Sequence, residues 1–221
     1  MVCLGDIVPD FQADSTKGPI HFHDYINDKW TLLFSHPSDF TPVCTSEIGQ
    51  AAKLQDQFGK RGVQLVGLAC NDIESHKQWM QDIEGSLSEG RKIEFPIVAD
   101  PERDVVSKYG MFDAEEGDEG GKFAGRAAFV IGPDKKLKLS MLYPASTGRS
   151  FGEILRAIDS LLVAENFPVA TPADWKKGDE VMILPKVSEE EAKEKFPHHR
   201  VIQVKSGKAY VRKTKLPSSE E

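Results

Sequence analysis

Short apolar runs alternate with amphipathic segments along most of the chain. The apolar runs have the length of buried strands, and the amphipathic segments carry apolar residues at helical spacing. Between them, residues 111–125 are acidic and rich in glycine, which indicates an exposed loop. The predicted strands cover residues 30–34, 63–69, 95–99, 127–131 and 137–143, and the predicted helices cover residues 46–60, 72–87, 101–109 and 150–164.

The order of these elements predicts an α/β fold. Strands that alternate with helices, followed by a hairpin and a final helix, are typical of a thioredoxin-like sandwich, in which helices flank a mixed central sheet. We assign this domain to residues 1–167, and residues 168–221 to a small C-terminal α+β extension. The extension is too small for a core of its own, so we expect it to pack on a partner surface. Its predicted parts are a linker at 168–175, a strand at 180–184, a charged helix at 188–195 and a hairpin of 201–204 with 209–212.

Composition places the chain among ordinary globular proteins. Of its 221 residues, 39% are hydrophobic and 29% are charged, values that do not suggest disorder. The net charge of -7 argues against nucleic-acid binding, because affinity for phosphates comes from clustered Lys and Arg. No run approaches the roughly 20 apolar residues that span a bilayer. We therefore expect no stable insertion into a membrane.

The three cysteines, Cys3, Cys44 and Cys70, are an odd number at wide spacings. Such a set is not a disulfide framework and suits a reducing compartment. Residues 1–6 lack the charged and apolar regions of a secretory signal, so we expect a cytoplasmic protein, with a removed import sequence as the open alternative. There is no C-x-x-C motif, and Thr41 stands where its first cysteine would be. Dithiol exchange chemistry is therefore not expected.

Cys44 is the candidate nucleophile. It follows the predicted strand 30–34 and lies at or near the first turn of the predicted helix 46–60. Unpaired N–H groups and the positive end of the helix dipole favour an anion there, and the thiolate is the reactive form of cysteine. Thr41, one helical turn earlier, can place its hydroxyl near the sulfur. The alternative is an inert cysteine buried at a helix start.

The segment P-S-D-F-T-P-V-C at residues 37–44 resembles the P-x-x-x-T-x-x-C active-site motif of peroxiredoxins. The longer string S-H-P-S-D-F-T-P-V-C-T is similar to the one-cysteine, peroxiredoxin-6-like branch, and the resemblance covers essentially the whole chain from Gly5 onward. It implies a thiol-dependent peroxidase that reduces hydrogen peroxide and organic hydroperoxides through a sulfenic acid on Cys44. We expect neither a cofactor nor a metal ion to take part.

The resemblance also implies roles for residues around Cys44. Arg126 matches the family's active-site arginine by position, and one cation there would stabilise both the thiolate and the departing oxygen. Arg149 matches a second arginine, and Glu47 is expected to pair with an arginine of the site. Pro37 is expected to shield the sulfur, and His36 to orient water or peroxide or to help set the thiolate. The alternatives are solvated charges, a simple loop proline and a histidine satisfied at a strand end.

No cysteine follows Asn71, so the chain lacks the C-terminal resolving cysteine of two-cysteine relatives. We interpret Cys3 and Cys70 as non-resolving, which leaves the sulfenic acid to an external thiol. The family implies glutathione with a glutathione transferase as the reductant, and a homodimer as the assembly. The alternative function is a redox-signalling or chaperone-like oligomer with little turnover.

Some members of this branch carry a second, lipase-like site, and the chain departs from it. His23 and Asp134 match its histidine and aspartate, but the serine string reads N-D-K-W-T, with Lys29 in place of the nucleophile. Acyl transfer without a hydroxyl has no route to an acyl-enzyme. We therefore expect no phospholipase activity.

Overall fold

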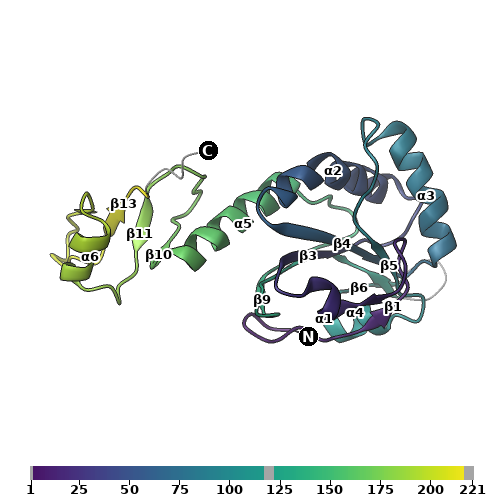
Figure 1. Cartoon of the computed structure of the whole chain (residues 1–221), viewed down its shortest axis with the longest axis horizontal. Helices are drawn as coiled ribbons and strands as arrows, with labels where there is room; N and C mark the ends of the chain where they lie inside the picture. The colour runs from purple at the N-terminus through teal and green to yellow at the C-terminus, as the bar shows by residue number, and fades with distance from the viewer. Residues whose placement is uncertain (1, 117–121, 217–221) are drawn as a thin grey trace. The chain divides into compact units, whose positions relative to one another are not determined.

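A computed structural model describes residues 2–116 and 122–216 and shows a mixed five-stranded sheet at the centre of the fold (Figure 1). The first three strands in spatial order run parallel to one another, as expected for strands joined through helices. The fourth strand pairs antiparallel with the third, and the fifth pairs antiparallel with the fourth. The α/β, thioredoxin-like prediction is confirmed. In spatial order the strands are β5 (Ile97–Ala99), β4 (Val63–Ala69), β3 (Trp30–Ser35), β8 (Arg126–Ile131) and β9 (Leu137–Tyr143).

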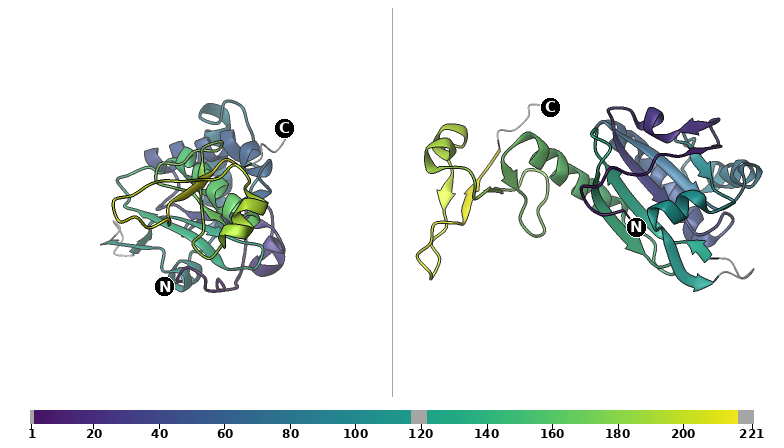
Figure 2. Two further views of the ribbon diagram at one scale, coloured as in Figure 1. Left: turned by 90° about the vertical axis from the view of Figure 1, so that its left-hand side faces the viewer. Right: turned by 90° about the horizontal axis from the view of Figure 1, so that it is seen from below.

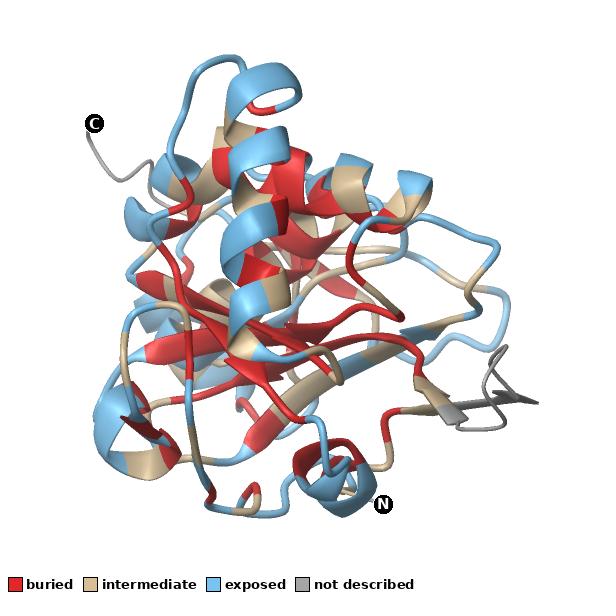
Figure 3. Ribbon diagram, turned by 90° about the vertical axis from the view of Figure 1, so that its right-hand side faces the viewer, coloured by how far each residue is buried: buried red, intermediate tan, exposed pale blue. Residues whose placement is uncertain are grey.

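The central strands are buried on both faces, which explains why they read as continuous apolar runs. All six residues of β3 and all six of β8 are buried, and Figure 3 shows the sheet as a buried layer between helices. Helices α2 (Pro42–Gly59) and α3 (Ile73–Ser86) cover one face. The short helices α1 (Phe22–Ile26) and α4 (Asp104–Tyr109) lie on the other.

The face with α1 and α4 holds a continuous apolar cluster. Phe22 stacks on Phe11 with ring centroids 4.5 Å apart, and Tyr109 meets both rings edge-on. The pair β1 (Gln12–Ala13) and β2 (Ile20–His21) forms a small antiparallel sheet at the N-terminal side. Burial of these aromatic rings supplies much of the energy that holds this layer on the sheet.

The segment 111–125 corrects one expectation. It was predicted as an exposed loop, but β6 (Phe112–Glu116) and β7 (Lys122–Ala124) pair as an antiparallel hairpin, and the centre of the segment lies outside the described residues. Met111 and Ala124 at its two ends are fully buried in the apolar cluster. Acidic residues and glycines dominate the segment, so its sequence pattern does not indicate these two buried residues.

The chain divides into two compact units after Phe151. Helix α5 (Phe151–Asn166) is thereby grouped with the tail, whereas the sequence-based division lies between residues 167 and 168. The tail contains a four-stranded antiparallel sheet and helix α6 (Glu189–Lys195) (Figure 2). Its strands are β10 (Val169–Ala170), β11 (Val181–Ile183), β13 (Arg212–Thr214) and β12 (Arg200–Val201).

The tail has a small core, so the expectation that it could not form one is wrong. Trp175 is 2% exposed and packs among residues from the strands, the connecting loops and α6. The tail achieves this because single apolar residues from many short segments converge on one tryptophan. The buried members of this cluster are Val169, Trp175, Val181, Ile183, Val187, Ala192 and Phe196.

Candidate active site

Cys44 lies in the first turn of α2, directly after the loop that leaves β3. The helix starts at Pro42, and Thr41 is its N-cap residue in extended conformation. The side chain of Cys44 is fully buried. The backbone N–H groups of this turn have no partner within the helix, so the helix end favours a negative charge on the sulfur.

Arg126 is the cation that lies beside Cys44. It is the first residue of β8, is only 3% exposed, and its Nη1 donates to the Cys44 Sγ over 3.4 Å. Its Nε and Nη2 both donate to the carbonyl oxygen of Ala145, at 3.0 and 2.7 Å. This fork fixes the plane of the guanidinium and holds Nη1 toward the sulfur. Arg126 is therefore not a solvated arginine at a strand end.

Glu47, one turn after Cys44, joins two arginines. One carboxylate oxygen accepts from Arg126 Nη1 at 2.8 Å and from Arg149 Nη2 at 2.7 Å. The other oxygen accepts from the backbone N and the Nε of Arg149 at 2.7 and 2.9 Å. Burial alone would raise the pKa of Glu47, but Arg149, with a smaller effect from Arg126, holds that pKa below its usual value. Glu47 therefore stays ionised, and Arg126 Nη1 serves both the carboxylate and the sulfur.

Arg149 supports this arrangement from the loop before α5. Its guanidinium carbon lies 5.5 Å from the ring centroid of Phe34, and its Nη1 donates to the carbonyl oxygen of Ala127 at 2.5 Å. Phe34 belongs to β3 and Ala127 to β8. Arg149 thus connects Glu47 to the two central strands of the sheet.

In the loop between β3 and α2, the Thr41 side chain bonds the loop itself. The Thr41 hydroxyl donates to the carbonyl oxygen of Ser38 at 2.9 Å, and among the described residues no hydrogen bond joins it to Cys44. Pro37 is buried, as a shield for the site would be. Phe40, by contrast, is 55% exposed and has a φ of 54°. That left-handed conformation is strained for a residue with a side chain, so the surrounding contacts must hold the loop in place.

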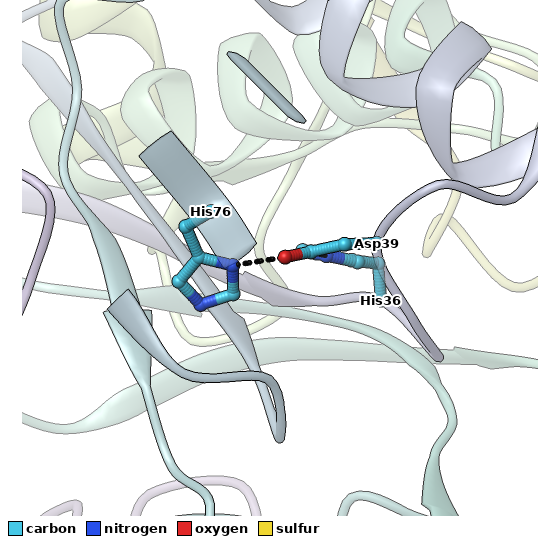
Figure 4. Close-up of side chains that lie close together, drawn as sticks. All are labelled: His36, Asp39 and His76. Atoms are coloured by element: carbon cyan, nitrogen blue, oxygen red, sulfur yellow. Dashed lines mark hydrogen bonds and ion pairs between the residues drawn. The ribbon is translucent and has the colours of Figure 1, made fainter. Parts of the chain in front are cut away.

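His36 belongs to a network that the sequence did not reveal (Figure 4). Its Nε2 lies 2.8 Å from Oδ1 of Asp39, and Nδ1 of His76 lies 2.7 Å from Oδ2 of the same carboxylate. Ser75 Oγ also donates to that Oδ2 at 2.7 Å. The side chains of His36, Asp39 and His76 are fully buried. No periodicity or short motif links His76 on α3 to Asp39 in the loop, because the contact spans 37 residues of sequence.

The protonation of this network follows from its geometry. Burial alone would raise the pKa of Asp39, but its hydrogen bonds with His36 and His76 hold that pKa well below its usual value. Burial lowers the pKa of His36, although Asp39 opposes the shift. The ligand atoms of the three residues lie within 4.8 Å of one another, as in a metal site. Because three donors already engage the carboxylate, we interpret the cluster as a hydrogen-bonded network.

A surface hollow of ≈ 410 Å³ lies beside the first turn of α2. Phe40, Trp79 and Leu87 form its apolar wall, and Thr41 and Thr45 lie on the helix side. Thr45, which lines the hollow, directly follows Cys44 in α2.

The other two cysteines have different surroundings. Cys3 is exposed and Cys70 is half-buried. Burial, with the charge of nearby Asp100, raises the pKa of Cys70 to about 11. Cys70 is therefore a thiol near neutral pH and a poor nucleophile.

The residues that match the lipase-like site have separate partners. His23 Nε2 lies 2.8 Å from the carbonyl oxygen of Val8, and Asp134 forms an ion pair of 2.8 Å with Lys138. Lys29, in the position of the absent serine, is exposed. His23 thus secures the N-terminal segment, and Asp134 secures the turn between β8 and β9.

A buried cysteine at a helix start, with an arginine on its sulfur and a thioredoxin-like sheet behind it, defines a class of thiol peroxidases. The sequence model of the AhpC/TSA family matches residues 4–140, and that of the C-terminal domain of 1-Cys peroxiredoxin matches residues 161–199. The chain belongs to the peroxiredoxins of the AhpC/TSA family and is a thiol-dependent peroxidase.

The similarity to individual proteins indicates the branch of the family to which the chain belongs. Peroxiredoxin-6 of Rattus norvegicus is 51% identical over 218 residues, which cover 97% of each chain. A 1-Cys peroxiredoxin of Medicago truncatula is 47% identical over 214 residues, covering 96% of this chain and 98% of that protein. The crystal structure of a cysteine-to-serine mutant of peroxiredoxin 6 of Arenicola marina is 50% identical, with a TM-score of 0.96 over 99% of this chain and 100% of that chain. Within the family, the chain is of the 1-Cys, peroxiredoxin-6-like type.

The structure described here has no membrane-spanning helix: none of the described helices combines the length and the apolar character that a bilayer crossing requires.

Proposed function

We propose that the protein reduces hydrogen peroxide and organic hydroperoxides through a sulfenic acid on Cys44. The observation that carries the proposal is the contact of Arg126 Nη1 with the buried Cys44 Sγ at 3.4 Å. The thiolate attacks one peroxide oxygen, so that a sulfur–oxygen bond forms as the oxygen–oxygen bond breaks. The departing oxygen leaves as hydroxide or alkoxide and takes a proton from solvent to become water or alcohol.

The charged residues around Cys44 have different roles in the reaction. Arg126 stabilises the thiolate before attack and the charge on the departing oxygen during it. Glu47 and Arg149 hold Arg126 in place, because the three side chains form one buried ion-pair network. Cys44 and Arg126 are buried away from water, which strengthens these interactions, and we assign part of this shielding to Pro37, which is also buried. Thr41 fixes the loop through Ser38 and presents its oxygen as an acceptor near the start of α2.

The sulfenic acid is resolved by an external thiol. Cys70 is poorly suited to attack it, because burial raises the pKa of its thiol, and exposed Cys3 is then the remaining thiol within the chain. One thiol condenses with the sulfenic acid to a mixed disulfide and water, and a second releases Cys44 and carries away a disulfide. The solved structure of a yeast mitochondrial 1-Cys peroxiredoxin, 43% identical with a TM-score of 0.89, is described as showing thiol resolution via glutathione and thioredoxin systems. Glutathione, delivered by a glutathione transferase, is the reductant we propose.

Mass spectrometry of the protein after one equivalent of peroxide tests this scheme. We expect a sulfenic acid on Cys44 alone, and a Cys44–glutathione mixed disulfide when glutathione is present. Multiple turnover with excess glutathione should persist in the Cys3→Ser and Cys70→Ser variants. A disulfide between Cys44 and Cys3 as the main product would contradict resolution by an external thiol.

We further propose a cytoplasmic homodimer. Strand β9 ends the order of the five-stranded sheet and carries Leu142, which is 58% exposed. An edge strand with an exposed apolar side chain can pair with a second copy. Sedimentation analysis of the wild type should show a dimer. The Leu142→Lys variant should dissociate into monomers at higher protein concentrations than the wild type does. A wild-type monomer at micromolar concentration would contradict the proposed assembly.

A further inference from the structure

We propose that Asp39 and His76 are positioning residues of the peroxidase site: they hold the loop of residues 36–41 against α3 and fix the tautomer of His36. The inference rests on the proposed function, because it concerns how the site around Cys44 is held. Neither residue contacts the sulfur through any hydrogen bond of the described chain. Both act through the loop and through His36.

Asp39 is anchored through its side chain and through its backbone. Its carboxylate accepts from His36 at one oxygen and from both Ser75 and His76 at the other. Its backbone N–H donates to Oδ1 of Asn71 at 3.0 Å. One residue of the loop is thereby tied to the end of β3, to the segment after β4 and to α3. A buried carboxylate that loses a donor is costly, so this arrangement has one stable geometry.

The bonds of Asp39 constrain the part of the loop that follows it. Phe40, directly after Asp39, has the strained φ of 54°, and Thr41, the next residue, occupies the N-cap position of the helix that carries Cys44. Strain of this kind persists only where surrounding contacts over-determine the backbone. The carboxylate of Asp39 supplies those contacts immediately before the strained residue. The start of α2, and with it Cys44, is therefore placed by the bonds of Asp39.

A second chain of hydrogen bonds connects α3 to the first turn of α2. Trp79, one turn after His76, donates from Nε1 to Thr45 Oγ1 at 3.0 Å, and that hydroxyl donates to the carbonyl oxygen of Thr41 at 2.7 Å. The ring of His36 lies 4.9 Å from the ring of Trp79. Helix α3 thus holds both the loop and the helix start, and it reaches the loop through Ser75 and His76.

Asp39 also determines which ring nitrogen of His36 carries the proton. Because a carboxylate accepts hydrogen bonds, the Nε2 of His36 that faces Asp39 carries the proton. The neutral ring then has a bare Nδ1, which is buried and has no partner among the described residues. An unpartnered buried acceptor is costly unless a ligand uses it. The hydrogen bond with Asp39 therefore leaves Nδ1 of His36 as a hydrogen-bond acceptor, which can accept from the O–H of water or peroxide.

The test uses two variants of His76 that differ in one hydrogen bond. Asn places an amide nitrogen where Nδ1 of His76 lies and can still donate to Asp39, whereas Leu cannot; both lose the contact of Nε2 with the carbonyl oxygen of Val98 at 3.3 Å. We expect His76→Leu to slow oxidation of Cys44 by peroxide by about 10- to 100-fold, as misplacement of reacting groups does. We expect His76→Asn to recover most of that loss. Thermal unfolding verifies that both variants are folded at the assay temperature.

Two further readouts separate positioning from a merely structural role. The rate of Cys44 alkylation by iodoacetamide should change much less than the peroxide rate, whereas general loosening of the site would increase it. Nitrogen NMR of the full-length protein should show a protonated Nε2 and a bare Nδ1 on His36, and Asp39→Asn should remove this preference.

The inference fails if both His76 variants oxidise at the wild-type rate, or if Asn and Leu slow the reaction equally. It also fails if His36 carries its proton on Nδ1 in the wild type. Failure of the proposed function would look different, because the wild type itself would then not consume peroxide.

Discussion

Replacement of Arg126 by Ala is the sharpest test of the electrostatic argument. The variant removes the Nη1 donor that lies 3.4 Å from Cys44 Sγ, together with the fork on Ala145. Loss of one well-placed transition-state donor costs about 2.7–4 kcal/mol in comparable sites. At about 1.36 kcal/mol per tenfold, the rate constant for oxidation of Cys44 should fall by about 100- to 1,000-fold.

The cost in stability should be smaller than the cost in rate. Glu47 keeps three of its four hydrogen bonds in the variant, because Arg149 donates through its backbone N, Nε and Nη2. The buried carboxylate is therefore not left as an unpaired charge, the situation that costs about 3–5 kcal/mol. We expect a loss of about 1.5–3 kcal/mol, the contribution of a hydrogen bond to a charged group.

The assay is a single-turnover reaction of the reduced protein with peroxide, followed by tryptophan fluorescence, with urea unfolding in parallel. Arg212→Ala is the matched control: Arg212 is 7% exposed and donates to carbonyl oxygens of Leu184 and Val187 in the tail. It should lower stability and leave the peroxide rate unchanged. An Arg126→Ala rate constant within about twofold of the wild type, or about 0.4 kcal/mol, would refute the role of Arg126.

Three other results are expected. Cys44→Ser should abolish peroxide consumption, whereas Cys70→Ser should keep it, because the raised pKa of Cys70 leaves its thiol unreactive; loss of turnover in the Cys70 variant would overturn this assignment. Because the pKa of Glu47 is lowered in the folded state, its stabilising contribution is complete above the unfolded value of about 4.3 and disappears as pH falls toward the folded value; Glu47→Gln should be less stable at pH 7 and show a flatter acid limb in urea titrations, and an unchanged limb would contradict the shift. Trp175→Ala should destabilise the tail core by about 3–5 kcal/mol, detectable as early hydrogen exchange of β11 and β13, and uniform exchange across the chain would argue against a tail with its own core.

The sequence predicted the elements that local pattern determines. The apolar runs of β3 and β4 and the amphipathic face of α2 each follow from a few consecutive residues. The hairpin at 111–125 escaped prediction because its anchors, Met111 and Ala124, are single buried residues at the ends of a polar segment. A single-residue anchor produces no periodicity.

The same limit applies to the site. The partners of Cys44 could be named from a resemblance, but the contact of Arg126 with Glu47 crosses 79 residues, and no local pattern indicates it. Asp39 and His76 were missed entirely, because their burial and pairing depend on how α3 packs beside the loop. Buried polar pairs are tertiary features, and a charged residue in a loop reads as solvated until its partners are in place.

The distance in sequence between Cys44 and its supporting charges has a consequence for biosynthesis. Arg126 follows Cys44 by 82 residues, and Arg149 follows its partner Glu47 by 102 residues. At roughly 5–20 residues per second, a ribosome needs roughly 5–20 s to translate from Glu47 to Arg149. Until the end of that interval the nascent chain carries the cysteine without both arginines in place. The contact of Arg126 with the Cys44 sulfur can therefore form only after β8 has been made and has paired with β3 in the sheet.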